Sequence, residues 1–292
     1  MAKIKGFKAL RYNENKINNI SEVIAPPYDV INKDQQELLY SMHENNIIKV
    51  DLNKTEGDKK YDEASRLFGN WIENEILIEE DMESIYPYHQ KFTFKGKEYE
   101  RLGIVALVKL SDFNEKVVLP HEETFSGPKA DRLKLMNSCK TNISPIFGVY
   151  DNSDDTVEKV VAQFIKNNNP IIEAKSLDGI TNKIWKISDS KTITQISSFF
   201  DSKEILIADG HHRYETSLNY SKANSSNEAS YVMFYLTGTI QDGLLINPTH
   251  RVLNETLSSE EITKSVIENF ITEEWLEDMN EDSLEADEFF YI

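Results

Sequence analysis

The apolar positions of the chain recur with two different periods, and together these predict a mixed α/β protein of α+β character. Short runs rich in β-branched and aromatic residues predict strands, because such side chains suit a pleated, half-buried surface. Stretches with an apolar residue at every third or fourth position predict amphipathic helices. Strands are expected at 4–10, 47–52, 84–94, 99–110, 145–150, 171–174, 183–187, 205–207, 231–239 and 244–246. Helices are expected at 32–44, 58–75, 126–140, 155–168, 191–200, 211–222 and 258–270.

One helix and one pair of strands among these segments are expected to supply much of the core. The helix at 58–75 carries Tyr61, Leu67 and Trp71 on one face, which predicts burial of that face. The strands 84–94 and 99–110 flank the turn Lys95-Gly96-Lys97 and predict a β-hairpin. Since 103–110 is nearly all apolar, the second strand is expected near the centre of a sheet.

Residues 204–220 combine a buried strand, a tight turn and a helix start, and we expect the functional site around them. A helix N-terminus offers unpaired backbone N–H groups and a partial positive charge. Gly210 lets a ligand approach the backbone, and Arg213 adds a bidentate cation. The pattern predicts an anion site, best suited to phosphate, at Gly210, His211, His212 and Arg213. The alternative is that Asp209 is an ordinary N-cap and both histidines are ordinary first-turn residues.

A second polar stretch follows the strand-like residues near 118. His121, Glu122 and Glu123 lie in its loop, and a helix then begins that carries Lys129 and Arg132. A histidine beside a carboxylate suits proton transfer, and two carboxylates suit a magnesium ion that bridges phosphates. The alternative is a solvated polar loop.

Two further pairs of residues are candidates on weaker grounds. The prolines before Tyr28 and Asp29 forbid a helix and present both side chains from a stiff segment, as in a pocket wall. His250 and Arg251 follow the expected strand at 244–246 and are placed with the phosphate-binding residues. Both pairs also suit ordinary loops.

Composition limits the partners. The 292-residue chain has a net charge of −18, which argues against nucleic acids and anionic lipid surfaces but not against a small phosphate compound. The single cysteine, Cys139, allows no disulfide within the chain and fits a reducing cytoplasm. No signal peptide, membrane span, Walker A loop or Rossmann glycine motif is present in the sequence, and the oligomeric state stays open.

Several motifs together resemble an uncharacterised prokaryotic family, domain of unknown function 1015. They are Ala25–Val30, His121–Thr124, Ser126–Arg132, Ser144–Phe147, Ala208–Thr216 and Asn247–Arg251, and the resemblance covers essentially the whole chain. Members of that family are usually longer, so we expect a missing C-terminal part after the acidic segment 273–288 and the apolar end 289–292.

A more distant resemblance is to the ParB/sulfiredoxin-like superfamily, especially its free L-serine kinases. The shared order is a His-Glu loop, a helix, the Pro145-Ile146 strand and an Asp-Gly-His-His-Arg helix start, with about 60 extra residues here before the last motif. The resemblance implies an N-terminal α+β region at 1–100, a ParB/sulfiredoxin-like core at 101–250 and a helical, acidic segment at 251–292.

By that resemblance the protein is expected to be a small-molecule kinase that uses Mg²⁺ with ATP or ADP. Arg213 and the histidines would hold nucleotide phosphates, and Glu122 would lie near the attacking hydroxyl. Asp209 would be a magnesium ligand or a base, with His211 also catalytic. Two alternatives stay open. One is a nucleotide-binding regulatory module without turnover, and the other is a metal-dependent phosphohydrolase built from His121, Glu122, Asp209, His211, His212 and His250.

Overall fold

The computed structural model describes residues 1–124, 126–224 and 226–246, together with residues 258, 260, 261, 263, 264 and 267. Contacts divide the chain into two units, Met1–Leu244 and Leu245–Ile292. The fold below is that of the first unit. The candidates His250 and Arg251 lie outside the described residues, as do much of the helix expected at 258–270 and most of segment 251–292.

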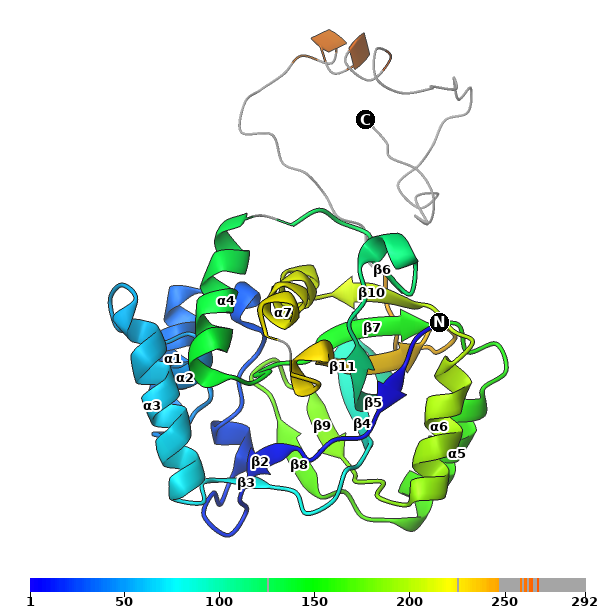
Figure 1. Cartoon of the computed structure of the whole chain (residues 1–292), viewed down its shortest axis with the longest axis horizontal. Helices are drawn as coiled ribbons and strands as arrows, with labels where there is room; N and C mark the ends of the chain where they lie inside the picture. Colours follow the sequence, from blue (N-terminus) through cyan, green and yellow to red (C-terminus); the bar gives the residue numbers. More distant parts are fainter. Residues whose placement is uncertain are drawn as a thin grey trace. The chain divides into compact units, whose positions relative to one another are not determined.

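A nine-stranded mixed sheet forms the centre of this unit (Figure 1). Its order is β6-β10-β7-β11-β5-β4-β9-β8, and β1 pairs with β5 beyond the end of β4. A separate sheet joins β2 and β3. The strands are β1 (Ile4–Lys5), β2 (Leu10–Tyr12), β3 (Leu77–Glu79), β4 (Tyr86–Phe94), β5 (Lys97–Lys109), β6 (Val118–Leu119), β7 (Ile146–Tyr150), β8 (Ile172–Lys175), β9 (Thr181–Ile184), β10 (Ile205–Asp209) and β11 (Tyr231–Gly238).

Helices follow the sequence pattern closely in most places. The α-helices are α1 (Lys33–Met42), α2 (Ile48–Asp51), α3 (Lys59–Glu73), α4 (Ser126–Cys139), α5 (Thr156–Asn167), α6 (Ser190–Phe200) and α7 (His211–Ala223). Short 3₁₀ helices are η1 (Ile20–Glu22), η2 (Tyr28–Val30), η3 (Phe113–Glu115) and η4 (Glu228–Ser230). The expectation of a mixed α/β protein is therefore confirmed.

Alternate residues of the central strands face one buried core, as strand geometry requires. Phe234 and Leu236 of β11 lie opposite Ala106 and Ile104 of β5, and all four are fully buried. Tyr214 of α7 belongs to the same cluster, with Val157 and Val161 of α5 and Ile196 and Phe200 of α6. Helix α7 is thereby fixed against the sheet beside the end of β10.

A second buried cluster joins α2, α3 and α4. The apolar face expected on α3 is confirmed, since Tyr61, Ala64 and Trp71 are buried. Leu135 of α4 belongs to this cluster, while α4 also packs against α7. Helix α4 consequently lies between α3 and α7 (Figure 1) and connects the two clusters.

The strand predicted at 47–52 is wrong, because residues 48–51 form the short helix α2. A short apolar run fits either a buried strand or a buried helical turn, and here Asn46 decides between them. Its side chain accepts a hydrogen bond from the Ile48 amide and donates to the carbonyls of Glu22 and Ile24, which starts the turn. One consequence is that Asp51 is buried, at 7% exposure.

Other boundaries also differ. The single strand expected at 4–10 is split into β1 and β2, because Gly6 packs closely against the backbone of Ser84 where the chain leaves the main sheet. The strand expected at 244–246 is wrong, since these residues have no regular structure and Ile246 is 90% exposed. Residue 100, the expected limit between an N-terminal region and a core, lies inside β5 and its hairpin with β4.

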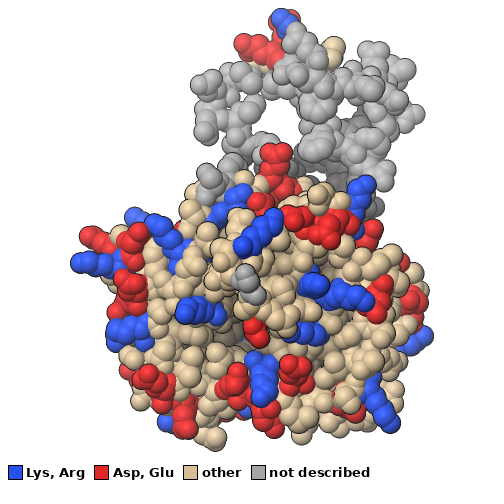
Figure 2. Space-filling model, in the orientation of Figure 1, with Lys and Arg blue, Asp and Glu red and all other residues tan. Residues whose placement is uncertain are grey.

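Charges of both signs are mixed over the surface. On the face drawn in Figure 2, lysine and arginine side chains are interspersed with aspartate and glutamate. Attraction of an anion on this face would therefore depend on a local group of cations. Each helix among the described residues is too short or too polar to span a lipid bilayer.

Candidate functional site

The turn between β10 and α7 places Arg213 over the start of its own helix. Gly210 adopts φ +97°, a left-handed conformation that residues with a Cβ avoid. A Cβ there would lie 2.9 Å from the guanidinium carbon of Arg213, so glycine also makes room for this side chain. Arg213 donates to the Asp209 carboxylate and to the Pro145 carbonyl. Asp209 is thus paired with Arg213, and no side chain caps α7 at Gly210.

Arg213 retains unused hydrogen-bond donors. A guanidinium carries five N–H groups, and Arg213 directs two of them to partners within the described residues. Its Nε is buried without a partner there, and the side chain is only 11% exposed. A buried donor without an acceptor costs about 1–3 kcal/mol, and a cation at a helix N-terminus is unfavourable. A bound anion would relieve both conditions.

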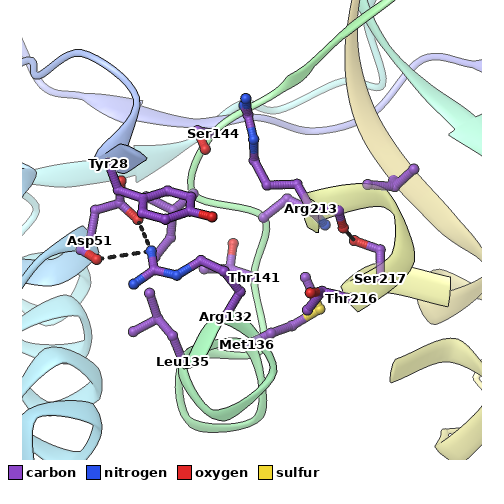
Figure 3. A pocket seen from close by; sticks show the side chains of 13 residues that line it. Tyr28, Asp51, Arg132, Leu135, Met136, Thr141, Ser144, Arg213, Thr216 and Ser217 are labelled. Carbon is purple, nitrogen blue, oxygen red and sulfur yellow. Dashed lines mark hydrogen bonds and ion pairs between the residues drawn. The ribbon is translucent and has the colours of Figure 1, made fainter. Parts of the chain in front are cut away.

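Arg213 lines a small pocket between α4 and α7 (Figure 3). The cavity measures about 40 Å³. One water needs about 10–15 Å³ on this scale, so the cavity suits about three waters or one phosphate or carboxylate group. The hydroxyls of Tyr28, Thr141 and Ser144 line it and bond to no described residue. The complete lining is Tyr28, Asp51, Arg132, Leu135, Met136, Thr141, Asn142, Ile143, Ser144, Arg213, Thr216, Ser217 and Val232.

Arg132 forms one wall of this pocket and is held on several sides. Its Nη1 donates to the carboxylate of Asp51 at 2.9 Å and to the Asp51 carbonyl at 3.0 Å. The Tyr28 ring lies over the guanidinium, 4.0 Å from it, with the phenol oxygen directed toward Arg213 (Figure 3). Burial raises the pKa of Asp51, and the nearby Arg132 charge partly offsets this. Arg132 therefore mainly fixes the wall of the pocket, because its donors are directed to neighbouring protein groups.

Asp131 holds Arg132 from the other side. Arg132 donates to it from Nε at 2.9 Å, while Lys60 and the Tyr61 hydroxyl donate to its second oxygen. Burial by itself would raise the pKa of Asp131. The hydrogen bonds outweigh burial and bring this pKa to about 2. The carboxylate is thus ionised at any pH at which the protein would normally be studied.

A second group of predicted residues meets on the other side of the first turn of α7. His211 is 1% exposed, and its Nδ1 lies 3.0 Å from a Glu122 oxygen. The backbone amide of His121 donates to Nε2 of His211 at 3.2 Å, and the two rings meet edge to face at 4.5 Å. Burial lowers the pKa of His211, and the Glu122 charge partly offsets this effect. The structure thus joins His121, Glu122 and His211, none of which lines the pocket.

Lys129 lies in a third, smaller group. It donates to Glu215 of α7 at 2.7 Å, and the Thr124 hydroxyl donates to the other oxygen of the same carboxylate. Burial would raise the pKa of Glu215, but these hydrogen bonds lower it overall. Lys129 therefore ties α4 to α7 and does not line the pocket.

The remaining predicted residues occupy separate positions. Asp29 and Glu123 are exposed, and His212 is half-buried in the first turn of α7. The residues expected to line a substrate pocket are Tyr28, Asp29, His121 and Glu123, and of these Tyr28 lines the cavity. Among the described residues, most of the predicted site residues thus lie in three groups around α7: the pocket, the cluster of His121, Glu122 and His211, and the contact of Lys129 with Glu215.

Sequence reasoning missed several residues of the pocket. Asp51 lies inside an apolar run, and the signal that could have found it is a lone acid between Val50 and Leu52, which indicates a buried, paired charge. Thr216 and Ser217 look like ordinary helix positions, and nothing in the sequence shows that they turn toward α4. Thr141 and Ser144 were also missed, because they lie in the irregular connection between α4 and β7.

The residues present do not suit a magnesium ion held by the protein. Magnesium prefers oxygen ligands in octahedral geometry. Asp209, the expected ligand, is paired with Arg213. Within the described residues, the group that can place three ligand atoms together is His121, Glu122 and His211, which offers two nitrogens and one oxygen. A nucleotide that carries its own Mg²⁺ is not affected by this mismatch.

Comparison with known proteins gives one match. A family model described as "Protein of unknown function (DUF1015)" matches residues 4–291, nearly the whole chain. No curated protein and no solved structure matches the chain.

Proposed function

The chain belongs to the DUF1015 family, and we propose that it is a phosphotransferase that moves a phosphoryl group from a nucleotide such as ATP or ADP to a small hydroxy compound. Free serine is the first acceptor to test. The observation that carries the proposal is Arg213, a largely buried guanidinium at an uncapped helix start, three of whose five donors have no partner among the described residues. This combination calls for an anion with several acceptor oxygens, and phosphate is the best fit.

The pocket gives the anion further donors. The hydroxyls of Tyr28, Thr141 and Ser144 bond to no residue in the described part of the chain and can donate there. A volume of about 40 Å³ admits one phosphate group, so the rest of a nucleotide would extend out of the cavity.

In the proposed reaction the acceptor oxygen attacks the terminal phosphorus. A new P–O ester bond forms, the P–O bond to the leaving nucleotide breaks, and the hydroxyl proton passes to a carboxylate. Glu122 suits that role because it is 52% exposed on one side and rests against His211 on the other. Such a reaction depends mainly on positioned charges and on an oriented acceptor.

The ParB/sulfiredoxin-like ancestry remains part of this proposal. It is supported by the order of elements, with the His121-Glu122 loop, α4, β7 and then the β10–α7 turn. The free serine kinases of that superfamily suggest the acceptor.

The test uses the full-length protein with Mg²⁺, ATP or ADP and a panel of hydroxy amino acids. Phosphorus NMR should show a new phosphoester that depends on the acceptor. Glu122→Gln should keep nucleotide binding and abolish turnover. Arg213→Ala should weaken binding by about 2–3 kcal/mol, as for charged hydrogen bonds left unmade, while Arg213→Lys should recover part of it. Absence of product across the panel, with a folded protein, would exclude the serine-kinase version.

A second candidate function is a nucleotide-binding regulatory module without turnover. It is favoured by the pocket lining, in which Asp51, the carboxylate among the described lining residues, is engaged by Arg132. Calorimetry separates the two candidates. Tight nucleotide binding without product or acceptor dependence supports the regulatory module.

A metal-dependent phosphohydrolase is the third candidate, and the group of His121, Glu122 and His211 favours it. It predicts release of inorganic phosphate from a phosphoester, with a bound transition metal in the purified protein. Elemental analysis without such a metal, and no phosphate release after metal is added, would contradict it.

A further inference from the structure

We infer that His121, Glu122 and His211 form a binding site for one divalent transition-metal ion of the Zn²⁺ type. The three residues place one ligand atom each within 4.8 Å of one another. His211 comes from the first residue of α7, whereas His121 and Glu122 are consecutive in the loop after β6. This inference does not rest on the proposed phosphotransferase activity, because its test measures metal binding alone.

The first argument concerns Nδ1 of His211. This atom is buried, and although a Glu122 oxygen lies only 3.0 Å away, the two are not aligned as a hydrogen bond. Ligand atoms about 2.0–2.2 Å from the same zinc ion stand roughly 3–3.5 Å apart. The separation of this nitrogen and this oxygen therefore suits a shared ion, and an ion would satisfy a buried polar atom that has no hydrogen-bond partner among the described residues.

The second argument concerns the ring of His121. Its Nδ1 lies 2.7 Å from the Ile207 carbonyl, which can only accept, so Nδ1 carries the ring proton. The other nitrogen, Nε2, is then a free lone pair on an exposed side chain. A metal-binding histidine commonly donates its second ring N–H to a carbonyl in this way, which fixes the tautomer and the ring orientation.

Metal binding also requires one local rearrangement. Coordination through Nδ1 of His211 moves the ring proton to Nε2, which now accepts from the His121 amide at 3.2 Å. That contact must open when the ion binds. The His121 amide, which loses this contact, should report the change.

The ligand set selects the class of ion. Two imidazoles and one carboxylate suit zinc, cobalt and their neighbours, whereas magnesium and calcium prefer oxygen alone. Three protein ligands leave a fourth position of a tetrahedral ion for water or an anion. The site differs from the expected one, because Asp209 is paired with Arg213 and is absent from it.

The experiment titrates the metal-free, untagged full-length protein with Co²⁺ and Zn²⁺. Cobalt should give d–d absorption bands of a site with nitrogen and oxygen ligands at one ion per chain, and Zn²⁺ should displace it. His121→Gln and Glu122→Gln should each weaken binding at least tenfold. Both positions are exposed, so the variants should fold. The matched controls Glu123→Gln and His89→Gln should bind as the parent protein does.

Two results would overturn the inference. One is the absence of stoichiometric binding of either ion. The other is binding that His121→Gln and Glu122→Gln leave unchanged, which would place the ion elsewhere. His211→Gln serves as a third variant, read together with its thermal unfolding because its side chain is buried. An NMR shift of the His121 amide on Zn²⁺ addition in the parent protein, absent in Glu122→Gln, supports the site.

Discussion

Replacement of Gly210 by alanine tests the geometry of the β10–α7 turn directly. The new methyl group meets two obstacles, because the backbone has φ +97° and the guanidinium of Arg213 would lie 2.9 Å away. Gly179 provides a matched control, with φ +87° and no atom within 4 Å of an added Cβ. Both substitutions share the conformational strain, and only the first also displaces Arg213.

The magnitudes follow from these two terms. The left-handed conformation should cost each variant about 1–2 kcal/mol. Displacement of Arg213 weakens its hydrogen bonds to Asp209 and Pro145, and loss of one such bond is worth about 0.5–1.5 kcal/mol. Gly210→Ala should therefore lower the free energy of unfolding by about 2–3 kcal/mol, and Gly179→Ala by about 1–2 kcal/mol.

Urea unfolding measures the stability of both variants, and calorimetry with inorganic phosphate or ATP measures the site. Gly210→Ala should bind the anion more weakly than the parent protein, because the guanidinium no longer holds its position. Gly179→Ala, in a distant β-turn between β8 and β9, should bind normally. Equal unfolding free energies and equal affinities for the two variants would refute the role given to Gly210.

Three further predictions concern the pocket wall and its surroundings. Arg132→Met should destabilise the fold by about 3–5 kcal/mol, because it leaves the Asp51 carboxylate buried and unpaired; the double variant with Asp51→Leu should recover much of this in urea unfolding. The pKa of Asp131 is about 2 in the folded protein, below the ordinary value of about 3.9. Its contribution to the free energy of unfolding is therefore complete above pH ~4 and lost as the pH falls toward 2. In Asp131→Asn, the free energy of unfolding should fall less steeply with pH between about 4 and 2 than in the parent protein. Burial raises the pKa of Cys139 to about 11, so iodoacetamide at pH 8 should label the native thiol on the order of 100-fold more slowly than the thiol in urea.

The sequence allowed most of the secondary structure to be predicted, because long periodic segments leave little choice. Helix α3 and the hairpin of β4 and β5 formed where their apolar residues indicated. The segment 47–52 was different, because a short apolar run suits a strand and a buried turn equally. Hydrogen bonds from Asn46 to a distant loop settled the choice, and no local pattern contains that information.

For the candidate site, the local parts were predictable and the distant pairings were not. The turn at Asp209–Arg213 is encoded in consecutive residues, so its strand, glycine and helix start were evident. The wall of the pocket depends on Tyr28, Asp51 and Arg132, which come together only when α2 and α4 pack. The separation of Glu122 from the pocket is likewise a result of tertiary packing. Glu122 contacts His211 on one side of the first turn of α7, and the pocket lies on another side of that turn, at Arg213.

The pocket draws its lining from residues as far apart as Tyr28 and Val232, and it lies where the two buried clusters adjoin. A molecule that fills it contacts α2, α4, α7 and β11 at once, and it has no equivalent partner in the unfolded chain. Occupancy is therefore coupled to global unfolding, and a ligand at 100 times its Kd adds about 2.7 kcal/mol of stability. A library of phosphorylated and carboxylated metabolites can then be ranked by the rise in melting temperature alone, before any reaction is known.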